Sequence, residues 1–340
     1  MRTVDIHAVE RPNSMHHPSL TPSCCAGLRQ TLMQGWQNAF PLHPSPFRQM
    51  AAASGSTPRE LLTTCLALQR DGALQPIRAR WGVAMRRMRW RLAFAERDMA
   101  QLLPVLAQLP GCLRIERVDR TQPGAACGCE PAVWAEFEAL DEAALQRQLD
   151  LLPHPPVARL AWPPMSGVGM DVAPEDVKLA AFAEHGFKLC SRPFADCARH
   201  LDCSEQRVLA VLQGWRRTGQ LECLTLKPPP GRGAQAGVLA LWHDLPASGE
   251  FVQRLRAQPN VDRVVAGDGT GSNPAWPWAL SVVLHAPPAL ALDRLREMRQ
   301  ASGLPCKPDA CLPVRIELPR DEARLFDGAV LAAPAAQTRH

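Results

Sequence analysis

The sequence contains no tyrosine, and aromatic residues make up only 5% of its 340 residues. Because proteins that bind single-stranded nucleic acid use aromatic side chains as stacking platforms, this scarcity argues against that class of protein. The sequence also lacks any apolar run near the roughly 20 residues that a membrane-spanning helix needs. Its longer apolar runs, such as Gly237–Trp242 and Ala279–Leu284, have the length of strands. We therefore expect no membrane-spanning segment.

The N-terminal residues Met1–Pro22 lack the apolar segment of a secretory signal. We expect residues 1–25 to form a disordered tail and the protein to lie in the cytoplasm. Neither sign of charge dominates, because 38 basic against 33 acidic residues leave a formal charge of +5. Such a mild excess fits an acidic ligand or DNA and establishes neither. The length and the 46% hydrophobic content indicate a soluble chain of two or three globular domains.

The twelve cysteines lack the paired C-x2-C spacing of a zinc site. The tight pairs are Cys24-Cys25 and Cys127-x-Cys129. Cysteines inside apolar patterns of a cytosolic chain are usually small buried hydrophobic residues. We therefore expect no metal site and no disulfide. The cysteines that we expect to be buried are Cys65, Cys112, Cys197 and Cys223.

The sequence does contain an internal repeat. Phe40-Pro-Leu-His-Pro-Ser-Pro-Phe47 is similar to Phe187-Lys-Leu-Cys-Ser-Arg-Pro-Phe194, which lies 147 residues later. Because further residues repeat at this offset without a gap, we infer a duplication whose halves each have about 150 residues. The further pairs are Ala51 and Ala198, Leu62 and Leu209, Gly72 and Gly219, and Leu74 and Leu221.

Each half begins with a pattern typical of a winged helix-turn-helix. In the first half, Thr57 and Glu60 form a capping box at the start of the third helix, and Gly72 follows its end. In the second half, Ser204 and Gly219 take these places. We expect winged units at residues 26–82 and 172–227. The expected elements are helices Ala26–Ala39, Pro46–Ala53, Pro58–Arg70 and Ser204–Arg217, and an extended wing Leu74–Trp81.

Each winged unit is followed by a pattern that predicts a ferredoxin-like βαββαβ domain. We place these domains at residues 83–162 and 228–320, with a linker at 163–171 and a tail at 321–340. The fold class is therefore α+β, a tandem duplication of a winged helix-turn-helix and a ferredoxin-like domain. The expected strands are Met88–Ala95, Cys112–Val118, Val133–Leu140, Val157–Trp162, Gly237–Trp242, Val261–Val265, Trp278–His285 and Val314–Leu318. The expected helices are Asp98–Leu109, Glu142–Leu152, Glu250–Ala257 and Leu290–Ala301.

This arrangement resembles the Lrp/AsnC regulators and, more specifically, the siroheme decarboxylases, which share that fold. The segments Phe40–Phe47 and Phe187–Phe194 are similar to the F-P-L-x-x-R-P-F pattern of that family. Pro274-Ala-Trp-Pro-Trp278 and Val282-Val-Leu-His285 look like its P-D-W-P-Y-N-L and M-I-H-G segments. The resemblance implies a fused two-subunit enzyme of haem d1 synthesis or the alternative haem pathway. Such an enzyme removes CO2 from two acetate side chains of siroheme and uses no organic cofactor.

A tetrapyrrole with eight carboxylates suits arginine side chains, which bind carboxylates with two parallel hydrogen bonds. The densest basic cluster lies at residues 80–91, where alternation would place Arg87, Arg89 and Arg91 on one face of a strand. Arg80 and Arg89 match two arginines of the family. The alternative is a solvated basic face or one that contacts DNA phosphates. The expected substrate-binding residues are Arg80, Arg87, Arg89, Arg91 and Arg232.

His285 ends a predicted core strand and matches a histidine of the family. The resemblance implies a catalytic residue that donates a proton or binds the iron of the substrate. The alternative is a histidine at a strand end with no catalytic role. Trp276 and Trp278 line a macrocycle pocket or fill the core, and core packing is the default.

Two other functions stay open at this point. The first is a DNA-binding regulator, although the helix Pro58–Arg70 offers few side chains for base contacts, whereas Ser204–Arg217 offers more. The second is a non-catalytic scaffold subunit. The expected partners are siroheme and either a second copy of the chain or related decarboxylase subunits, with DNA a weaker expectation.

Overall fold

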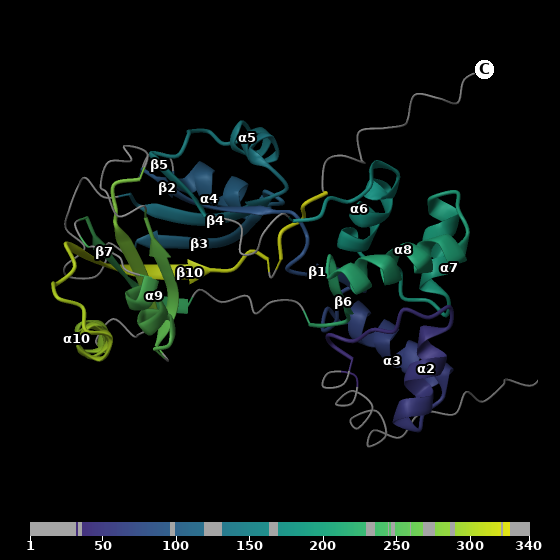
Figure 1. The fold of residues 1–340 in the computed structure, drawn as a ribbon. Helices are drawn as coiled ribbons and strands as arrows, with labels where there is room; N and C mark the ends of the chain where they lie inside the picture. Colours follow the sequence, from purple (N-terminus) through teal and green to yellow (C-terminus); the bar gives the residue numbers. More distant parts are fainter. Residues whose placement is uncertain are drawn as a thin grey trace, which may run out of the picture.

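The computed structural model describes residues 32, 36–95, 99–118, 131–162, 169–228, 235–243, 245, 249–258, 260–267, 276–285, 290–320 and 322–326. These residues form a sheet lobe and a helical lobe (Figure 1). Each lobe contains one part of each half of the chain, so the lobes do not correspond to the halves. Among the described residues, no helix has the length and apolar character needed to cross a membrane.

The helical lobe contains the two winged helix-turn-helix units. The first unit contributes α2 (Pro46–Ser54), α3 (Pro58–Arg70) and β1 (Arg78–Trp81). The second contributes η1 (Pro174–Asp176), α6 (Val177–His185), α7 (Pro193–His200), α8 (Glu205–Thr218) and β6 (Leu221–Thr225). The first expected helix, Ala26–Ala39, and the expected tail at 1–25 lie largely outside the described residues.

Side-chain caps fix where the third helix of each unit begins. The Thr57 hydroxyl accepts the backbone N–H of Glu60 at 3.2 Å, and the Glu60 carboxylate accepts the N–H of Thr57 at 2.8 Å. The Ser204 hydroxyl caps α8 with a single bond, accepting the N–H of Arg207 at 3.1 Å. Both helices are followed by a glycine in the left-handed region, with φ 71° at Gly72 and 80° at Gly219. The predicted caps are confirmed.

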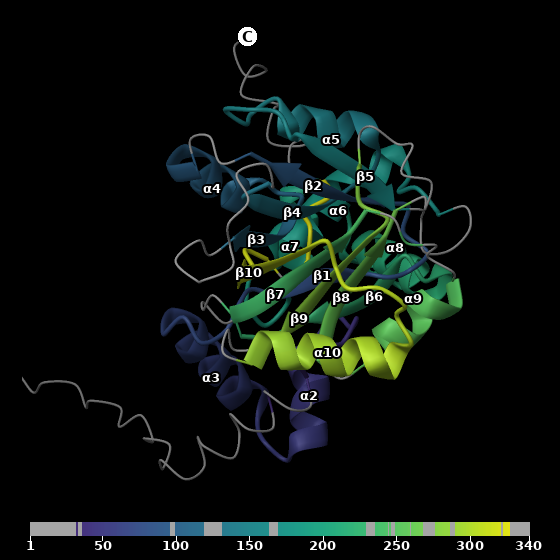
Figure 2. The same ribbon diagram turned by 90° about the vertical axis from the view of Figure 1, so that its left-hand side faces the viewer.

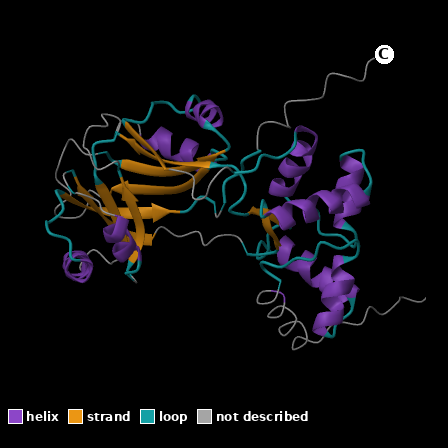
Figure 3. Cartoon of the chain, viewed as in Figure 1, coloured by secondary structure: helices purple, strands orange, loops and turns teal. Residues whose placement is uncertain are grey.

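The two wings pair with each other rather than extending from the lobe (Figure 3). β1 and β6 form a two-stranded antiparallel sheet. In this sheet Arg78 lies opposite Thr225, and these two residues are equivalent in the repeat because they are 147 positions apart. The winged units are therefore related by a local two-fold axis through this residue pair.

The repeated phenylalanines obey the same symmetry. The N–H of Phe40 donates to Leu224 at 3.1 Å, and the N–H of Phe187 donates to Ile77 at 2.7 Å. Each of these phenylalanines also makes an edge-on contact within its own unit. The ring centroids are 5.7 Å apart for Phe40 with Phe47, and 5.3 Å apart for the equivalent pair in the second half. The residues that repeat in the sequence thus make the same core contacts in both winged units.

The sheet lobe is built from one eight-stranded sheet with the order β5-β2-β4-β3-β10-β7-β9-β8. Within each half the order is fourth, first, third, second, which is the ferredoxin-like topology expected from the sequence. The halves join where β10 pairs antiparallel with β3. The strands are β2 (Met88–Phe94), β3 (Cys112–Val118), β4 (Val133–Ala139), β5 (Ala158–Trp162), β7 (Gln235–Trp242), β8 (Val261–Ala266), β9 (Leu280–His285) and β10 (Ala310–Glu317).

Helices cover the outer face of the sheet at opposite ends of this lobe (Figure 2). α4 (Met99–Gln108) and α5 (Glu142–Leu149) cover the first half, and α9 (Gly249–Arg256) and α10 (Ala291–Ser302) cover the second. A third apolar cluster takes side chains from strands of both halves. We call the face that carries it the inner face, because it is the face turned away from the helices.

β10 starts earlier than the sequence predicts. The expected strand begins at Val314, but the observed one begins at Ala310 and includes Pro313. Residues 310–313 pair with β7 alone, and pairing with β3 starts only at Val314. A proline, which lacks an N–H, is tolerated where one side of the strand is unpaired.

Part of the expected tail at 321–340 is folded against the helical lobe. Ala323, Leu325 and Phe326 are buried there, and the Phe326 ring lies 5.4 Å from that of Trp81. The Glu184 carboxylate accepts the N–H groups of Leu325 and Phe326, both at 2.8 Å. The sequence did not reveal this contact, because a short apolar segment carries no periodicity that marks it as packed.

Candidate functional site

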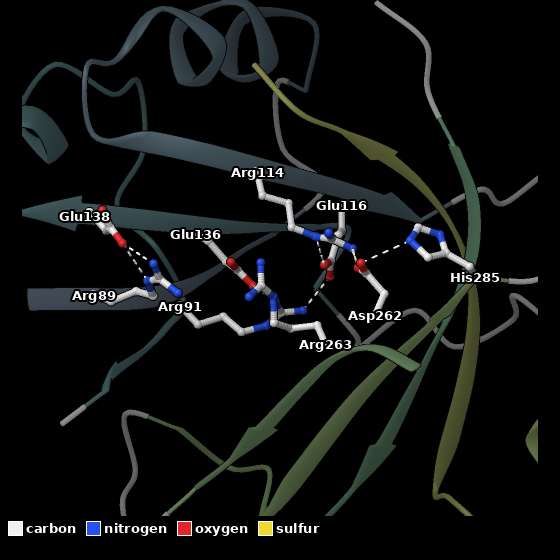
Figure 4. Close-up of polar contacts among 9 residues, drawn as sticks. All are labelled: Arg89, Arg91, Arg114, Glu116, Glu136, Glu138, Asp262, Arg263 and His285. Carbon is white, nitrogen blue, oxygen red and sulfur yellow. Dashed lines mark hydrogen bonds and ion pairs between the residues drawn. The ribbon is translucent and has the colours of Figure 1, made fainter. Parts of the chain in front are cut away.

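Charged side chains gather on the inner face of the first half. In β2, Trp90, Leu92 and Phe94 point to the core under α4 and α5, so the alternate residues Arg89 and Arg91 point to the inner face. The same alternation places Glu136 and Glu138 of β4 there, together with Arg114 and Glu116 of β3 (Figure 4). Residues far apart in sequence thereby form one polar surface.

Arg91 lies at the centre of this surface, and both of its terminal nitrogens are paired with carboxylates. One of its terminal nitrogens lies 3.0 Å from Glu136 Oε1, and the other contacts Glu116 Oε2. Arg114 Nε lies 2.6 Å from the second oxygen of Glu116. The side chains of Arg91, Glu116 and Glu136 are at most 1% exposed. The structure therefore places Arg91 in an internal ion-pair network and not at an open surface.

The second half extends this network through two consecutive residues of β8. Arg263 Nε lies 3.0 Å from Glu136 Oε1, and Asp262 pairs with Arg114. Both neighbours reach the inner face because a register shift in the β8–β9 pairing, between Val261 and Arg263, interrupts the alternation. His285 Nε2 then lies 3.0 Å from Asp262 Oδ1. We call the whole set the ion-pair ladder; it consists of Arg263, Glu136, Arg91, Glu116, Arg114, Asp262 and His285.

The ladder balances three guanidinium groups with three carboxylates, as charges removed from water require. Burial opposes ionisation of Glu116, but the guanidiniums of Arg91 and Arg114 outweigh it and hold the pKa of this carboxyl below its ordinary value. Burial also opposes the charge of Arg114, yet Glu116 and the other carboxylates raise its pKa. Both ends of the ladder are partly exposed, with 43% of the His285 side chain and 32% of the Arg263 side chain accessible.

Arg87 and Arg89 form a second group, which is more accessible than the buried middle of the ladder. Arg89 Nε donates to Glu138 Oε1 at 2.8 Å, and Arg87 lies 3.4 Å from the other oxygen of Glu138. Each arginine side chain keeps just over a quarter of its surface exposed. β2 begins at Met88, so Arg87 precedes the strand but still shares the carboxylate. These two guanidiniums are placed where a solute can reach them.

The remaining predicted site residues lie elsewhere or outside the described residues. Arg80 is on β1 in the helical lobe, where its Nε lies 2.9 Å from Glu222 and 3.8 Å from Glu322. The structure therefore does not bring Arg80 together with Arg89 and His285. Arg232 lies outside the described residues.

Three tryptophans pack beside the ladder on the inner face. The ring centroids of Trp134, Trp276 and Trp278 are 4.5 to 5.6 Å apart, and all three side chains are buried. The Arg91 guanidinium lies 5.3 Å from the Trp134 ring. The default expectation of core packing is confirmed for Trp276 and Trp278. Within the described part of the chain, none of the three indole N–H groups has a hydrogen-bond acceptor.

The acidic half of this site was missed from the sequence. A signal was present, because Glu136 and Glu138 alternate with apolar residues in a strand that is buried throughout. Carboxylates in a buried strand need cationic partners. Asp262 carried no such signal, since it reaches the inner face only through the register shift in β8.

Two grooves open on the helical lobe, away from the ladder. One of about 700 Å³ lies between α8 and residues 36–42, and one of about 590 Å³ lies on another side of α8. Gln213 of α8 donates to the Leu42 carbonyl at 3.4 Å across the first groove. No cluster of three or more metal-binding side chains occurs in the described ranges. Neither groove is lined by a residue of the ladder.

The sequence matches no protein-family model and no curated protein. Among solved structures, the chain is similar to the crystal structure of the siroheme decarboxylase NirDL in co-complex with an iron-uroporphyrin III analogue. The TM-score is 0.59 and the identity 16%, over 88% of this chain and 94% of that one. A second structure of NirDL gives a TM-score of 0.58 at 15% identity with the same coverage. AsnC from E. coli matches 46% of the chain at a TM-score of 0.27, which is too low to support an argument. The chain thus has the fold of a siroheme decarboxylase over nearly its whole length.

Proposed function

We propose that the chain is a siroheme decarboxylase, or a subunit of one, that removes CO2 from two acetate side chains of siroheme. The observation that carries the proposal is the fold shared over 88% of the chain with NirDL, a protein whose structure was solved with an iron-uroporphyrin III analogue. The inner face adds the chemistry, since it holds accessible arginines and a histidine in one lobe. The proposed product is didecarboxysiroheme.

In this proposal Arg87 and Arg89 bind substrate carboxylates, because guanidinium forks match carboxylates in geometry and charge. Arg91 acts indirectly, because its guanidinium is paired with Glu116 and Glu136 and its side chain is only 1% exposed, whereas Arg87 and Arg89 can be reached by a solute. Contacts of Arg80 and Arg232 with siroheme stay predictions. Because Arg80 lies in the helical lobe, it could bind siroheme only through a substrate carboxylate that reaches that lobe. The iron belongs to the substrate, and the reaction needs no organic cofactor.

The reaction balances with one proton for each acetate. The bond between the methylene carbon and the carboxylate carbon breaks, CO2 leaves, and the electron pair stays on the methylene carbon. A proton then converts that carbon to a methyl group. We propose that His285 in its imidazolium form supplies this proton and is recharged from water. A less polar site favours the loss of the carboxylate charge.

The alternative of a DNA-binding regulator is the weaker proposal. The β1–β6 pairing occupies the wings and not the recognition helices, but Arg207 of α8, a side chain that could contact DNA, pairs with Asp176 at 2.7 Å. α8, the more basic of the two candidate recognition helices, is bonded at Gln213 to the segment that precedes α2. The proposal therefore retains siroheme as the ligand, in the cytoplasm, with a homodimer or a hetero-oligomer of related subunits as the assembly.

An anaerobic assay tests the proposal. Purified protein is titrated with siroheme while the Soret absorbance is recorded, and the mixture is then analysed by mass spectrometry. We expect saturable binding at micromolar siroheme and a product lighter by two CO2 units, about 88 mass units for a proton-for-carboxylate exchange. Binding without mass loss, alone and with related subunits, would favour the scaffold function. No binding would remove the tetrapyrrole proposal.

A further inference from the structure

Asp262 occupies a junction between the two halves of the chain. One of its oxygens lies 3.0 Å from His285 Nε2, and the other contacts the buried Arg114 of the first half. Its side chain is 21% exposed, and that of Arg114 is 4% exposed. The carboxylate therefore joins an accessible imidazole to a buried cation.

We propose that Asp262 is a positioning residue for His285 and that the first half of the chain holds it in place through Arg114. The catalytic meaning of this role rests on the proposed decarboxylase function. The geometric role does not, because it concerns only the orientation and tautomer of the imidazole. Nothing in the sequence assigns a role to Asp262.

The contact with Asp262 selects the ring nitrogen of His285 that carries a hydrogen. A carboxylate offers no hydrogen of its own, so the favoured tautomer has its hydrogen on Nε2, the nitrogen that lies 3.0 Å from Asp262 Oδ1. In the neutral ring Nδ1 is then the unprotonated nitrogen, and in the imidazolium Nδ1 carries the transferable proton. This orienting arrangement, a carboxylate behind an imidazole, leaves the opposite nitrogen free to exchange protons.

The remainder of the ladder prevents Asp262 from turning away. Arg114 is held by Glu116, which is held in turn by Arg91. Each of these three side chains is at most 4% exposed. Side chains that are packed and paired in this way have one arrangement, and a catalytic group needs support of this kind to keep its geometry. The position of His285, a residue of the second half, thus depends on buried residues of the first half.

The chain contains a matched control on the same half. His243 Nδ1 lies 3.3 Å from Asp309 Oδ2, and the His243 side chain is 43% exposed, as is that of His285. Asp309, however, is 53% exposed and pairs with no arginine in the ranges that the structure describes. The two histidine–aspartate pairs therefore share the exposure of the imidazole. They differ in the ring nitrogen used and in the support of the aspartate, because Asp309 Oδ2 accepts the backbone N–H of His243 at 2.7 Å whereas Asp262 contacts a buried arginine.

The experiment compares Asp262→Asn, Asp262→Ala and Asp309→Asn with the full-length parent protein. The first readout is the ring tautomer of His285, measured by ¹⁵N NMR of histidine-labelled protein and assigned with His285→Gln. We expect the Nε2–H tautomer to dominate in the parent and in Asp309→Asn. In Asp262→Ala the two tautomers should be populated as in a free histidine. Asp262→Asn keeps an amide oxygen as acceptor, so we expect the tautomer to be largely retained.

The second readout is siroheme turnover. We expect kcat to fall by about tenfold or more in Asp262→Ala with KM changed less than about twofold, a smaller loss in Asp262→Asn, and no change in Asp309→Asn. A tautomer that is unchanged in Asp262→Ala overturns the positioning role, whatever the activity. The tautomer could change in Asp262→Ala even though the parent protein does not decarboxylate siroheme. That result would uphold the positioning role of Asp262 and reject the proposed function. Equal losses in the Asp262 and Asp309 variants would also overturn the inference.

Discussion

Arg91 and Glu116 form a buried ion pair although the strands that carry them are not neighbours. β4 lies between β2 and β3 in the sheet, and Arg91 reaches across it while also pairing with Glu136 of β4. Both side chains of the pair are at most 1% exposed. Together with Glu136, the pair therefore ties three strands together on the inner face, where the two halves meet. Because a shift of one strand would separate these charges, the pair fixes the register of the strands in addition to the apolar packing.

Removal of the Glu116 charge tests the energetic importance of this pair. Glu116→Gln leaves Arg91 and Arg114 buried beside a neutral amide, so we expect the free energy of unfolding to fall by about 3–5 kcal/mol. Urea denaturation followed by circular dichroism measures the loss. The matched control is Glu250→Gln, which breaks an exposed pair with Arg254 and should cost at most about 1 kcal/mol. Equal losses in the two variants would contradict the structural role of the ladder.

The pH dependence of stability follows from the lowered pKa of Glu116. A carboxyl whose pKa is lower in the folded than in the unfolded state stabilises the fold above its unfolded value, which is ordinarily 4.5. That contribution is lost as the pH falls through the lower folded value. We expect the free energy of unfolding to drop from pH 6 to pH 3, and to drop less in Glu116→Gln. Parallel pH curves for the two proteins would show that Glu116 titrates alike in both states.

Much of this architecture could be predicted from the sequence, and the limits have physical causes. The offset between Phe40 and Phe187 indicated the duplication, and Thr57 and Gly72 indicated where a helix begins and ends, because these signals are local. The ladder depends on strands that meet only in the folded chain. The carboxylates Glu136 and Glu138 could be suspected from the sequence, because they alternate with apolar residues in a buried strand. The place of Asp262 could not be predicted, because a single sequence does not show a register shift. The basic cluster and the resemblance to the family both group Arg80 with Arg89, but the fold places Arg80 on β1 of the helical lobe and Arg89 on β2 of the sheet.

Glu184 is expected to hold the C-terminal segment on the helical lobe. Its carboxylate accepts the N–H groups of Leu325 and Phe326 and the indole N–H of Trp81, the last at 2.7 Å. Glu184→Ala leaves these donors without their acceptor, so we expect a stability loss of about 2–4 kcal/mol. Hydrogen exchange at Leu325 and Phe326 should accelerate more than exchange at β4. Unchanged protection of these two amides would show that packing of Phe326 alone holds the segment.

The buried cysteines are expected to be unreactive in the folded protein. Cys65, Cys112 and Cys197 are buried, and burial raises the pKa of each thiol to about 12. Because the thiolate is the reactive form, alkylation by iodoacetamide at pH 8 should be slow at these positions and faster at the exposed Cys203. Peptide mapping by mass spectrometry gives the rate at each cysteine. Labelling of Cys112 as fast as Cys203 in the folded state would contradict its burial.

The central claim is that the chain replaces two acetate carboxylates of siroheme with protons, and isotope incorporation tests it most directly. Siroheme is incubated anaerobically with the protein in deuterium oxide, and the tetrapyrrole mass is measured with the parent and with His285→Ala. We expect the parent to give a product lighter by about 86 mass units, since each lost CO2 leaves one deuterium on carbon, and the variant to give it far more slowly. Siroheme recovered at its original mass, from the chain alone and from mixtures with related subunits, would contradict the account.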